Sequence, residues 1–214
     1  MINCPVYLTN ITNSCGSNIG GVKEVAIANY GFANFEYDYQ IVDVKTQEEY
    51  TSLTPTEQAK YELVDENYVQ YAKDIDGEKI IASIKSATLN EGFTKAKKYA
   101  FRDETATYTE TLQTNTNGVN FWEASINMVF GRLDSAKRLS ITALMQGQCQ
   151  AIVTDNNKKR WVLSIERPLR MSSGDVTTGT AFADDNAYTI ALTASSTIMS
   201  VPISEEAYTA LVEQ

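Results

Sequence analysis

The chain has 214 residues, of which 43% are hydrophobic and 10% aromatic, and a formal net charge of -9. This length and composition supply a core for one substantial domain, or for a domain with an insertion, without a stabilising disulfide framework. The acidic balance excludes repressor and polymerase classes, because affinity for phosphates comes from clustered Lys and Arg that release counterions. An acidic surface is typical of a soluble protein, and it is also compatible with a conduit through which DNA passes without binding.

Histidine is missing from the chain, which removes the commonest means of activating a serine or cysteine nucleophile. The three cysteines, Cys4, Cys15 and Cys149, have no CxxC spacing, so the sequence supports neither a zinc site nor a complete disulfide framework. A bridge between Cys4 and Cys15 is an alternative to free thiols. We expect no signal peptide and no membrane segment, since the chain lacks a basic start with a long apolar core and any run of 18 apolar residues.

The first 21 residues are rich in Asn and Gly and predict an arm that lies over the surface or on a neighbour. Its run GSNIGG lacks the lysine of a phosphate-binding loop and is interpreted as a flexible turn. Residues 22–32 then predict a strand that ends at Tyr30-Gly31-Phe32. Residues 35–44 predict a half-buried strand, because aromatic and polar side chains alternate along them.

A helix signal follows in which Thr54 is the N-cap, Pro55 the first helical residue and Glu57 the third residue after the cap. We expect a short exposed helix that continues as far as Asn67, so that residues from about 45 to 67 form a small helical insertion. Asp76-Gly77 then predicts a hairpin turn, since glycine tolerates the positive φ of a tight turn.

Two long strands are predicted from about residue 99 to Gly131, on either side of TNTNG at 114–118. In the first strand, threonine hydroxyls share one face, and larger polar side chains share the other. The threonines are Thr105, Thr107, Thr109 and Thr111, and the larger side chains are Arg102, Glu104, Tyr108 and Glu110. In the second strand, Trp122, Ala124, Ile126, Met128 and Phe130 share a face that must be buried. Strands with two polar faces are weakly specified alone, so we expect the first strand to pair with other subunits or to line a wet surface.

Asp134 is the predicted N-cap of a flanking helix over 135–146 that stops at Gly147. We expect Leu139 and Leu144 to be buried against the sheet, at on the order of 2 kcal/mol per side chain. Beyond this helix, the sequence predicts a hairpin of residues 148–155 and 160–167 with its turn at Asn156-Asn157-Lys158. A loop at 171–186 and strands at 187–194 and 199–203 follow, and a capped helix over 204–214 ends the prediction.

Three acidic groups were weighed as sites, and the sequence favours a structural role for each. Asp184, Asp185 and Asn186 lack the spaced oxygen ligands of a calcium loop, and Asp74, Asp76 and Glu78 lack its downstream bidentate glutamate. Glu104, Glu110 and Glu123 are candidates for a carboxylate pair of a glycoside hydrolase, but nothing singles out two of them. The basic turn at 158–160 is too small for a nucleic-acid site. We therefore predict no catalytic, cofactor-binding or metal-binding residues.

Four segments carry a resemblance to a known family: CGSNIGGVKEVAIANYG, FWEASINMVFGRLDSAKR, QAIVTDNNKKRWVL and TTGTAFADDNAYTIALTA. Together they resemble the tail-tube-like ring proteins of phages that infect Bacteroidota, crAss-like phages among them. The resemblance covers about half of the chain, and the segment from Lys45 to Tyr99 has no counterpart in it.

The resemblance implies a mainly β fold, a sandwich or barrel over residues 22–203 with a flanking helix, in a non-enzymatic virion protein without a cofactor. Its partners would be copies of itself in a closed ring, neighbouring tail or portal-proximal ring proteins, and double-stranded DNA as passing cargo. It implies assembly in the host cytoplasm and a final place in the virion tail. By analogy, the arm Met1–Gly21 and the loop Met171–Asn186 would contact other subunits or rings.

Two other functions stay open on the residues alone. The twelve tyrosines and two tryptophans could form a sugar platform, which would make the chain a receptor- or glycan-binding β module. A hydrolase with two acidic residues is the third alternative.

Overall fold

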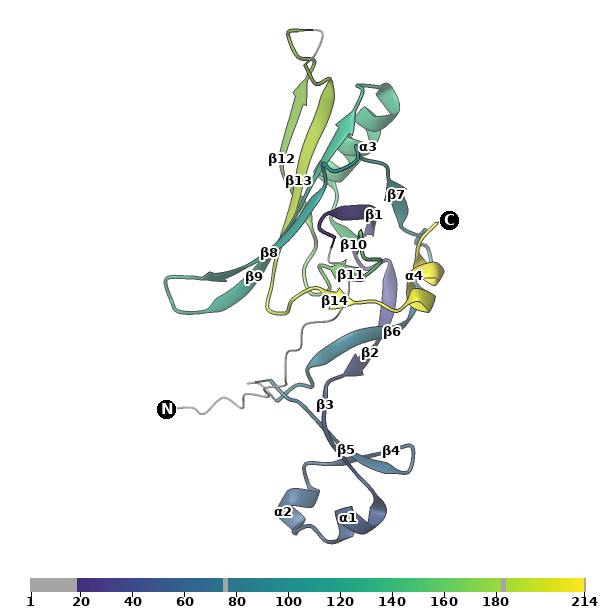
Figure 1. Cartoon of the computed structure of the whole chain (residues 1–214), viewed down its shortest axis with the longest axis vertical. Coiled ribbons are helices and arrows are strands. Elements are labelled where there is room, and N and C mark those ends of the chain that lie inside the picture. Colours follow the sequence, from purple (N-terminus) through teal and green to yellow (C-terminus); the bar gives the residue numbers. More distant parts are fainter. Residues whose placement is uncertain (1–18, 75–76, 182–183, 214) are drawn as a thin grey trace. The chain divides into compact units, whose positions relative to one another are not determined.

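The computed structural model describes residues 19–74, 77–181 and 184–213, and it is mainly β, as the sequence predicts (Figure 1). The chain divides into two compact units. The larger unit is made of Ser17–Glu36 and Ile84–Gln214, and the smaller one includes Tyr37–Ser83. The predicted insertion at 45–67 therefore lies inside a longer compact segment.

Two antiparallel sheets build the larger unit. The five-stranded sheet has the order β14 (Val201–Pro202), β11 (Arg160–Leu163), β10 (Cys149–Asp155), β1 (Val22–Asn29) and β7 (Lys97–Tyr99). The four-stranded sheet has the order β12 (Arg170–Thr177), β13 (Ala187–Ser196), β9 (Asn120–Gly131) and β8 (Thr107–Thr114).

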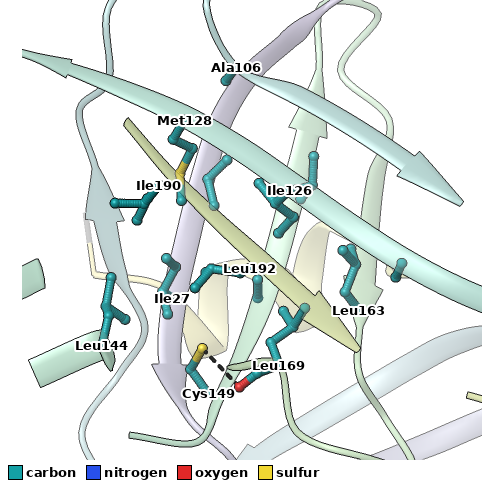
Figure 2. Packing of buried hydrophobic residues seen from close by; sticks show 14 of the residues in the cluster. Ile27, Ala106, Ile126, Met128, Leu144, Cys149, Leu163, Leu169, Ile190 and Leu192 are labelled. Atoms are coloured by element: carbon teal, nitrogen blue, oxygen red, sulfur yellow. Dashed lines mark hydrogen bonds between the residues drawn. The ribbon is translucent and has the colours of Figure 1, made fainter. Parts of the chain in front are cut away.

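The inner faces of these two sheets meet in one hydrophobic core. Every second residue of β9 from Ala124 to Phe130 is buried, which confirms the predicted period of two. Figure 2 shows Ile126, Met128, Ile190 and Leu192 of the four-stranded sheet gathered with Ile27 and Leu163 of the other sheet. Trp122 is only half-buried, so the buried stripe of β9 begins at Ala124, two residues later than the sequence predicts.

The other face of the five-stranded sheet holds the C-terminal helix α4 (Glu205–Leu211). Ser204 caps it by accepting a hydrogen bond from the Ala207 amide, as predicted for a capped helix. The Tyr208 hydroxyl donates to the Glu24 carboxylate of β1. The Arg160 guanidinium of β11 lies 4.1 Å from the Tyr208 ring centroid and pairs with Glu205. The helix is thus fastened by a buried aromatic ring and two charged contacts.

The flanking helix α3 (Ser135–Gln146) begins as predicted, since the Asp134 carboxylate accepts from the Lys137 amide at 2.8 Å. Its buried residue is Leu144, with Ile141 half-buried. The predicted burial of Leu139 is wrong, because this side chain is 74% exposed. The contact face follows Lys137, Ile141 and Leu144 at helical spacings of four and three, and Leu139, two residues from Lys137 and from Ile141, points away from it.

The smaller unit has the sheet order β3 (Ile41–Lys45), β5 (Asn67–Tyr71) and β4 (Glu62–Val64), with one-turn helices α1 (Gln47–Thr51) and α2 (Pro55–Gln58). The predicted helix from Pro55 to Asn67 is wrong beyond Gln58. Asp65 and Glu66 take positive φ values of 45 and 70° and turn β4 back onto β5 as a hairpin. A second capping box, Thr46 with Glu49, begins α1 and was not predicted.

β2 (Ala33–Tyr39) and β6 (Ile81–Leu89) form a two-stranded sheet, and the boundary between the units falls within both strands. The predicted strand over 35–44 is interrupted at Gln40. Its amide donates to the Ile80 carbonyl at 2.9 Å and its carbonyl accepts from the Ala72 amide at 2.8 Å, so the chain changes partners at this residue.

Three further strand boundaries differ from the prediction. β8 begins only at Thr107, because the backbone turns at Glu104, which has a φ of 60°. β11 ends at Leu163, since Ser164 has a φ of 64°. The first part of the predicted loop 171–186 belongs to a strand, β12, whose polar sequence RMSSGDVT carries no apolar alternation.

Replacement of Leu144 by Ala should lower the free energy of unfolding by about 2–3 kcal/mol, because the side chain is 7% exposed and leaves a cavity in the core. Leu139→Ala in the same helix is the matched control and should change it by less than about 0.5 kcal/mol. Urea denaturation followed by circular dichroism measures both; equal effects would contradict the observed contact face of α3.

Glu166 should make stability depend on pH. Its carboxylate accepts from the Thr197 amide at 2.7 Å and from the Ser196 and Thr197 hydroxyls. Partial burial acts to raise the pKa of Glu166, but these hydrogen bonds outweigh it, so the pKa lies below its ordinary value of 4.5. A depressed folded-state pKa gives stabilisation that is present above the unfolded-state value and is lost as pH falls through the folded-state value.

Glu166→Gln should therefore reduce the loss of unfolding free energy between about pH 5 and pH 3 relative to the unmodified chain. Glu91→Gln, at an exposed turn, provides the matched control. Denaturation curves across this pH range measure the slopes, and a slope for Glu166→Gln equal to that of the unmodified chain would refute the assignment.

Candidate functional site

The four-stranded sheet ends in β12 on one side and in β8 on the other, and each has one strand partner among the described residues (Figure 1). Successive strands of this sheet are antiparallel, so β8 and β12 run in opposite directions. An outer strand without a second partner presents backbone amides and carbonyls that can pair with another chain. These two edges are the candidate assembly surface.

The outward side chains of β8 agree with the predicted two-faced pattern. Thr107, Thr109 and Thr111 are exposed, whereas Tyr108 and Glu110 on the opposite face are half-buried. Thr105 was assigned to the hydroxyl face but lies before the strand, where its hydroxyl donates to the Arg102 carbonyl. Between residues 111 and 120 every side chain but the half-buried Gln113 is exposed, including Leu112 and Val119. The end of the β8–β9 hairpin therefore packs on nothing within the described chain.

β12 is the second edge, and its side chains are exposed apart from the half-buried Met171. The strand contains Ser172, Ser173 and Asp175, with Val176 as an exposed apolar residue. A bulge interrupts its pairing with β13 between Met171 and Ser173. Both edges of the sheet are thus polar, which is how natural proteins keep open edges from uncontrolled aggregation.

The three candidate carboxylates do not form a catalytic pair. Glu110 lies opposite Ala124 and Thr111 lies opposite Glu123, so Glu110 and Glu123 project from opposite faces of the sheet. Glu110 accepts from the Ser200 amide at 2.8 Å and from its hydroxyl at 2.6 Å. Glu123 accepts from the Gln113 amide group at 3.2 Å. Glu104 stands outside β8 in the turn, so the arrangement joins strands and offers no acid–base couple.

Asp184, Asp185 and Asn186 follow one another in one loop, and each binds a different part of the chain. The Asp184 carboxylate accepts from the Ala181 and Thr180 amides, both at 2.7 Å, and these bonds lower its pKa. Asp185 pairs with Arg102 at 2.5 Å, and the Asn186 side-chain carbonyl accepts from the Leu133 amide at 3.1 Å. Within the described ranges no group of three acidic or sulfur ligands gathers in a way that could hold a metal ion.

The second candidate calcium loop is a turn. The Asp74 carboxylate accepts from the Glu78 amide at 2.9 Å, and the Asp74 amide donates to the Glu78 carbonyl at 2.8 Å. Gly77 has a φ of 88°, which favours glycine. Asp76 lies outside the described residues.

Of the cysteines, Cys149 is described, and Cys4 and Cys15 lie outside the described residues. Cys149 is a free, buried thiol whose Sγ lies 3.5 Å from the Leu169 carbonyl (Figure 2). Burial raises its pKa to about 11. The thiol therefore stays protonated near neutral pH, which suits a core residue and not a nucleophile.

The candidate aromatic platform is divided among separate places. Trp161 is half-buried and stacks on Tyr108 with centroids 6.4 Å apart. Trp122 lies on β9, and six of the twelve tyrosines belong to residues 37–83. In that unit Tyr50 stacks on Tyr68 at 3.6 Å and contacts Tyr61 edge-on. These rings mostly pack on one another.

The described end of the N-terminal arm is fastened to the turn between β10 and β11. The Ile19 amide donates to the Asn157 side chain at 3.1 Å, and the Asn156 side chain donates to the Gly20 carbonyl at 2.7 Å. The basic turn that follows is divided, because Arg160 pairs with Glu205 while Lys158 and Lys159 are exposed. Residues 1–18 of the arm lie outside the described residues.

A groove between β7 and α3 was not predicted. It has a volume of about 300 Å³ and an apolar floor that includes Tyr99, Phe130 and Ile141. Lys97, Lys98 and Lys137 line it. The run KAKKYA at 95–100, three lysines in an otherwise acidic chain, is the sequence signal for it.

Among the described residues, no helix has the length and apolar character needed to cross a bilayer. Comparison of the chain with protein-family models, with curated proteins and with solved structures gave no match.

Proposed function

We propose that this chain is a virion structural protein, a subunit of an oligomeric ring or tube in a phage tail that forms part of the conduit for DNA ejection. The proposal assigns no catalysis, no cofactor and no metal to the chain. Its partners are copies of itself, neighbouring ring proteins of the tail, and passing double-stranded DNA. The resemblance of the sequence motifs is the reason for proposing a phage tail, and the open sheet edges support an oligomeric ring.

The observation that carries the proposal is the pair of open, polar and oppositely directed edges, β8 and β12. A rotation about an axis along the strands brings β8 of one copy against β12 of the next in antiparallel orientation. Repetition of that contact closes into a ring in which both edge strands of the four-stranded sheet have a partner. Ring closure also gives a role to the exposed threonine face of β8, which would line a hydrated bore.

The alternative function is a receptor- or glycan-binding β module. The twelve tyrosines and two tryptophans of the sequence motivate it, but Trp161 and Tyr108 pack against the core and form no open platform. A monomer that binds polysaccharide would support this alternative against the ring.

Cysteines placed at Thr109 of β8 and Ser173 of β12 should cross-link neighbouring copies. Within one copy these strands are three strand spacings apart, or about 14 Å, which exceeds the roughly 7 Å that a disulfide spans between Cα atoms. In a background with Cys4→Ser and Cys15→Ser, mild oxidation should give a ladder of covalent oligomers with a sharp upper limit. Denaturing gel electrophoresis and mass measurement read the result.

The matched control keeps Thr109→Cys and moves the second cysteine to Thr142, an exposed residue of α3. It should give no ladder. Asp175→Cys, two residues further along β12, is the second partner to test. A monomer at tens of micromolar with no ladder from either pair would refute the ring.

A further inference from the structure

The charge of the chain is concentrated in the smaller unit. Residues 37–83 contain eleven acidic and four basic side chains, which gives them a formal charge of -7 out of the -9 of the whole chain. The rest of the chain is therefore close to neutral and contains the lysine-lined groove between β7 and α3. The two surfaces are complementary in sign.

The smaller unit also has little core of its own. Among its described residues, Val69 and Ala72 are the buried hydrophobic ones. On one face of its sheet, α1 is attached to Tyr68 through Tyr50 stacking and the Tyr68 hydroxyl bond to Gln47. The Gln58 side chain of α2 in turn donates to the Tyr50 carbonyl. A three-stranded sheet this thin gains stability when its second face is covered.

That second face carries exposed apolar side chains. Ile41 pairs with Tyr71, Val44 with Val69, and Val64 with Asn67 across the strands. Because Asn67, Val69 and Tyr71 alternate along β5, their partners Ile41, Val44, Val64 and Glu62 share one face. At its centre Val69 is already buried, and Lys79 pairs with Glu62 and lies 4.3 Å from the Tyr71 ring centroid. The open part of this face is therefore the margin formed by Ile41, Val44 and Val64. These three are 52%, 50% and 37% exposed. Asp65 and Glu66 stand at the turn that ends this face, and both are exposed.

The groove offers the complementary chemistry. Tyr99 and Phe130 meet edge-on at 6.2 Å in its floor. Lys97 has no ion-pair partner among the described residues, whereas Lys98 pairs with Glu24 and Lys137 with Asp134. A cavity of about 170 Å³ adjoins the groove, shares Lys97 and Tyr99 with it, and adds Lys95. The groove has an apolar floor with the unpaired Lys97 at its rim. It is therefore complementary to the apolar face of the smaller unit, which ends at the carboxylates of Asp65 and Glu66.

We propose that the smaller unit of one copy docks by its Ile41–Val44–Val64 face in the β7–α3 groove of a second copy, with Glu66 facing Lys97. The contact rests on the self-association proposed above, but not on the pairing of β8 with β12. It assigns the segment without a counterpart in the tail-tube resemblance to the joining of subunits. The occupant is a second copy because the same chain supplies both complementary surfaces.

Charge exchange tests the contact. Lys97→Glu and Glu66→Lys should each weaken self-association about tenfold at ~50 mM salt, and the double variant should recover to within about threefold of the unmodified chain. Lys23→Glu on the exposed side of β1 is the control for net charge and should have a smaller effect. Sedimentation velocity measures the association, and melting temperature verifies folding. Additive losses in the double variant, or equal losses from Lys97→Glu and Lys23→Glu, would overturn the docking.

Mixing two singly substituted proteins separates contacts between copies from contacts within one. In the Cys4→Ser and Cys15→Ser background, Val64→Cys protein is mixed with Ala136→Cys protein of different mass, since Ala136 lines the groove. Oxidation should give a covalent heterodimer, and Thr142→Cys in place of Ala136→Cys should not. No heterodimer in samples where the 109–173 ladder forms would refute this contact alone, and absence of the ladder with the heterodimer present would refute the β8–β12 pairing alone.

Discussion

The apolar contact between the inner faces of two sheets is the constraint on which the larger unit depends. Ile126 and Met128 of β9 and Ile190 and Leu192 of β13 are almost fully buried against the five-stranded sheet. Burial of this kind stabilises by about 1.5–3 kcal/mol per side chain. It also occupies the inner surface of both sheets. The other side of the five-stranded sheet holds α4, so the unpaired backbone groups that remain lie at strand edges.

Strands with alternating residues, the edge strand β8 among them, were predictable, whereas the edge strands β12 and β7 were not. A strand such as β9 buries one face, and this requires an apolar side chain at every second residue. In β9 these are Ala124, Ile126, Met128 and Phe130. β12 buries almost nothing, so its residues need only tolerate an extended backbone, and RMSSGDVT is indistinguishable from a loop. β7 has three residues, too few for any periodicity. Of the two edges proposed for assembly, β8 was predicted and β12 is the one about which the sequence carries least information.

The first residues of helices were predicted better than helix faces. Asp134, Thr54 and Ser204 all precede helices as predicted, because a capping side chain acts over three residues and needs no tertiary context. The face of α3 that contacts the core depends on where the sheets lie, and Leu139 was assigned to the wrong side. The groove beside α3 has the same origin. Its lysines come from β7 and α3, about forty residues apart in the sequence, and only the fold brings Lys97 and Lys137 together.

The number of strands has a consequence for any assembly through the edges. Four antiparallel strands give two outer strands that run in opposite directions, so copies related by rotation along the strands meet in antiparallel register. A sheet of three or five such strands would present edges running the same way, and the same rotation would pair them in the weaker parallel geometry. β12 supplies the fourth strand while adding almost nothing to the core. Its retention makes physical sense if its backbone, and not its side chains, is what the protein uses.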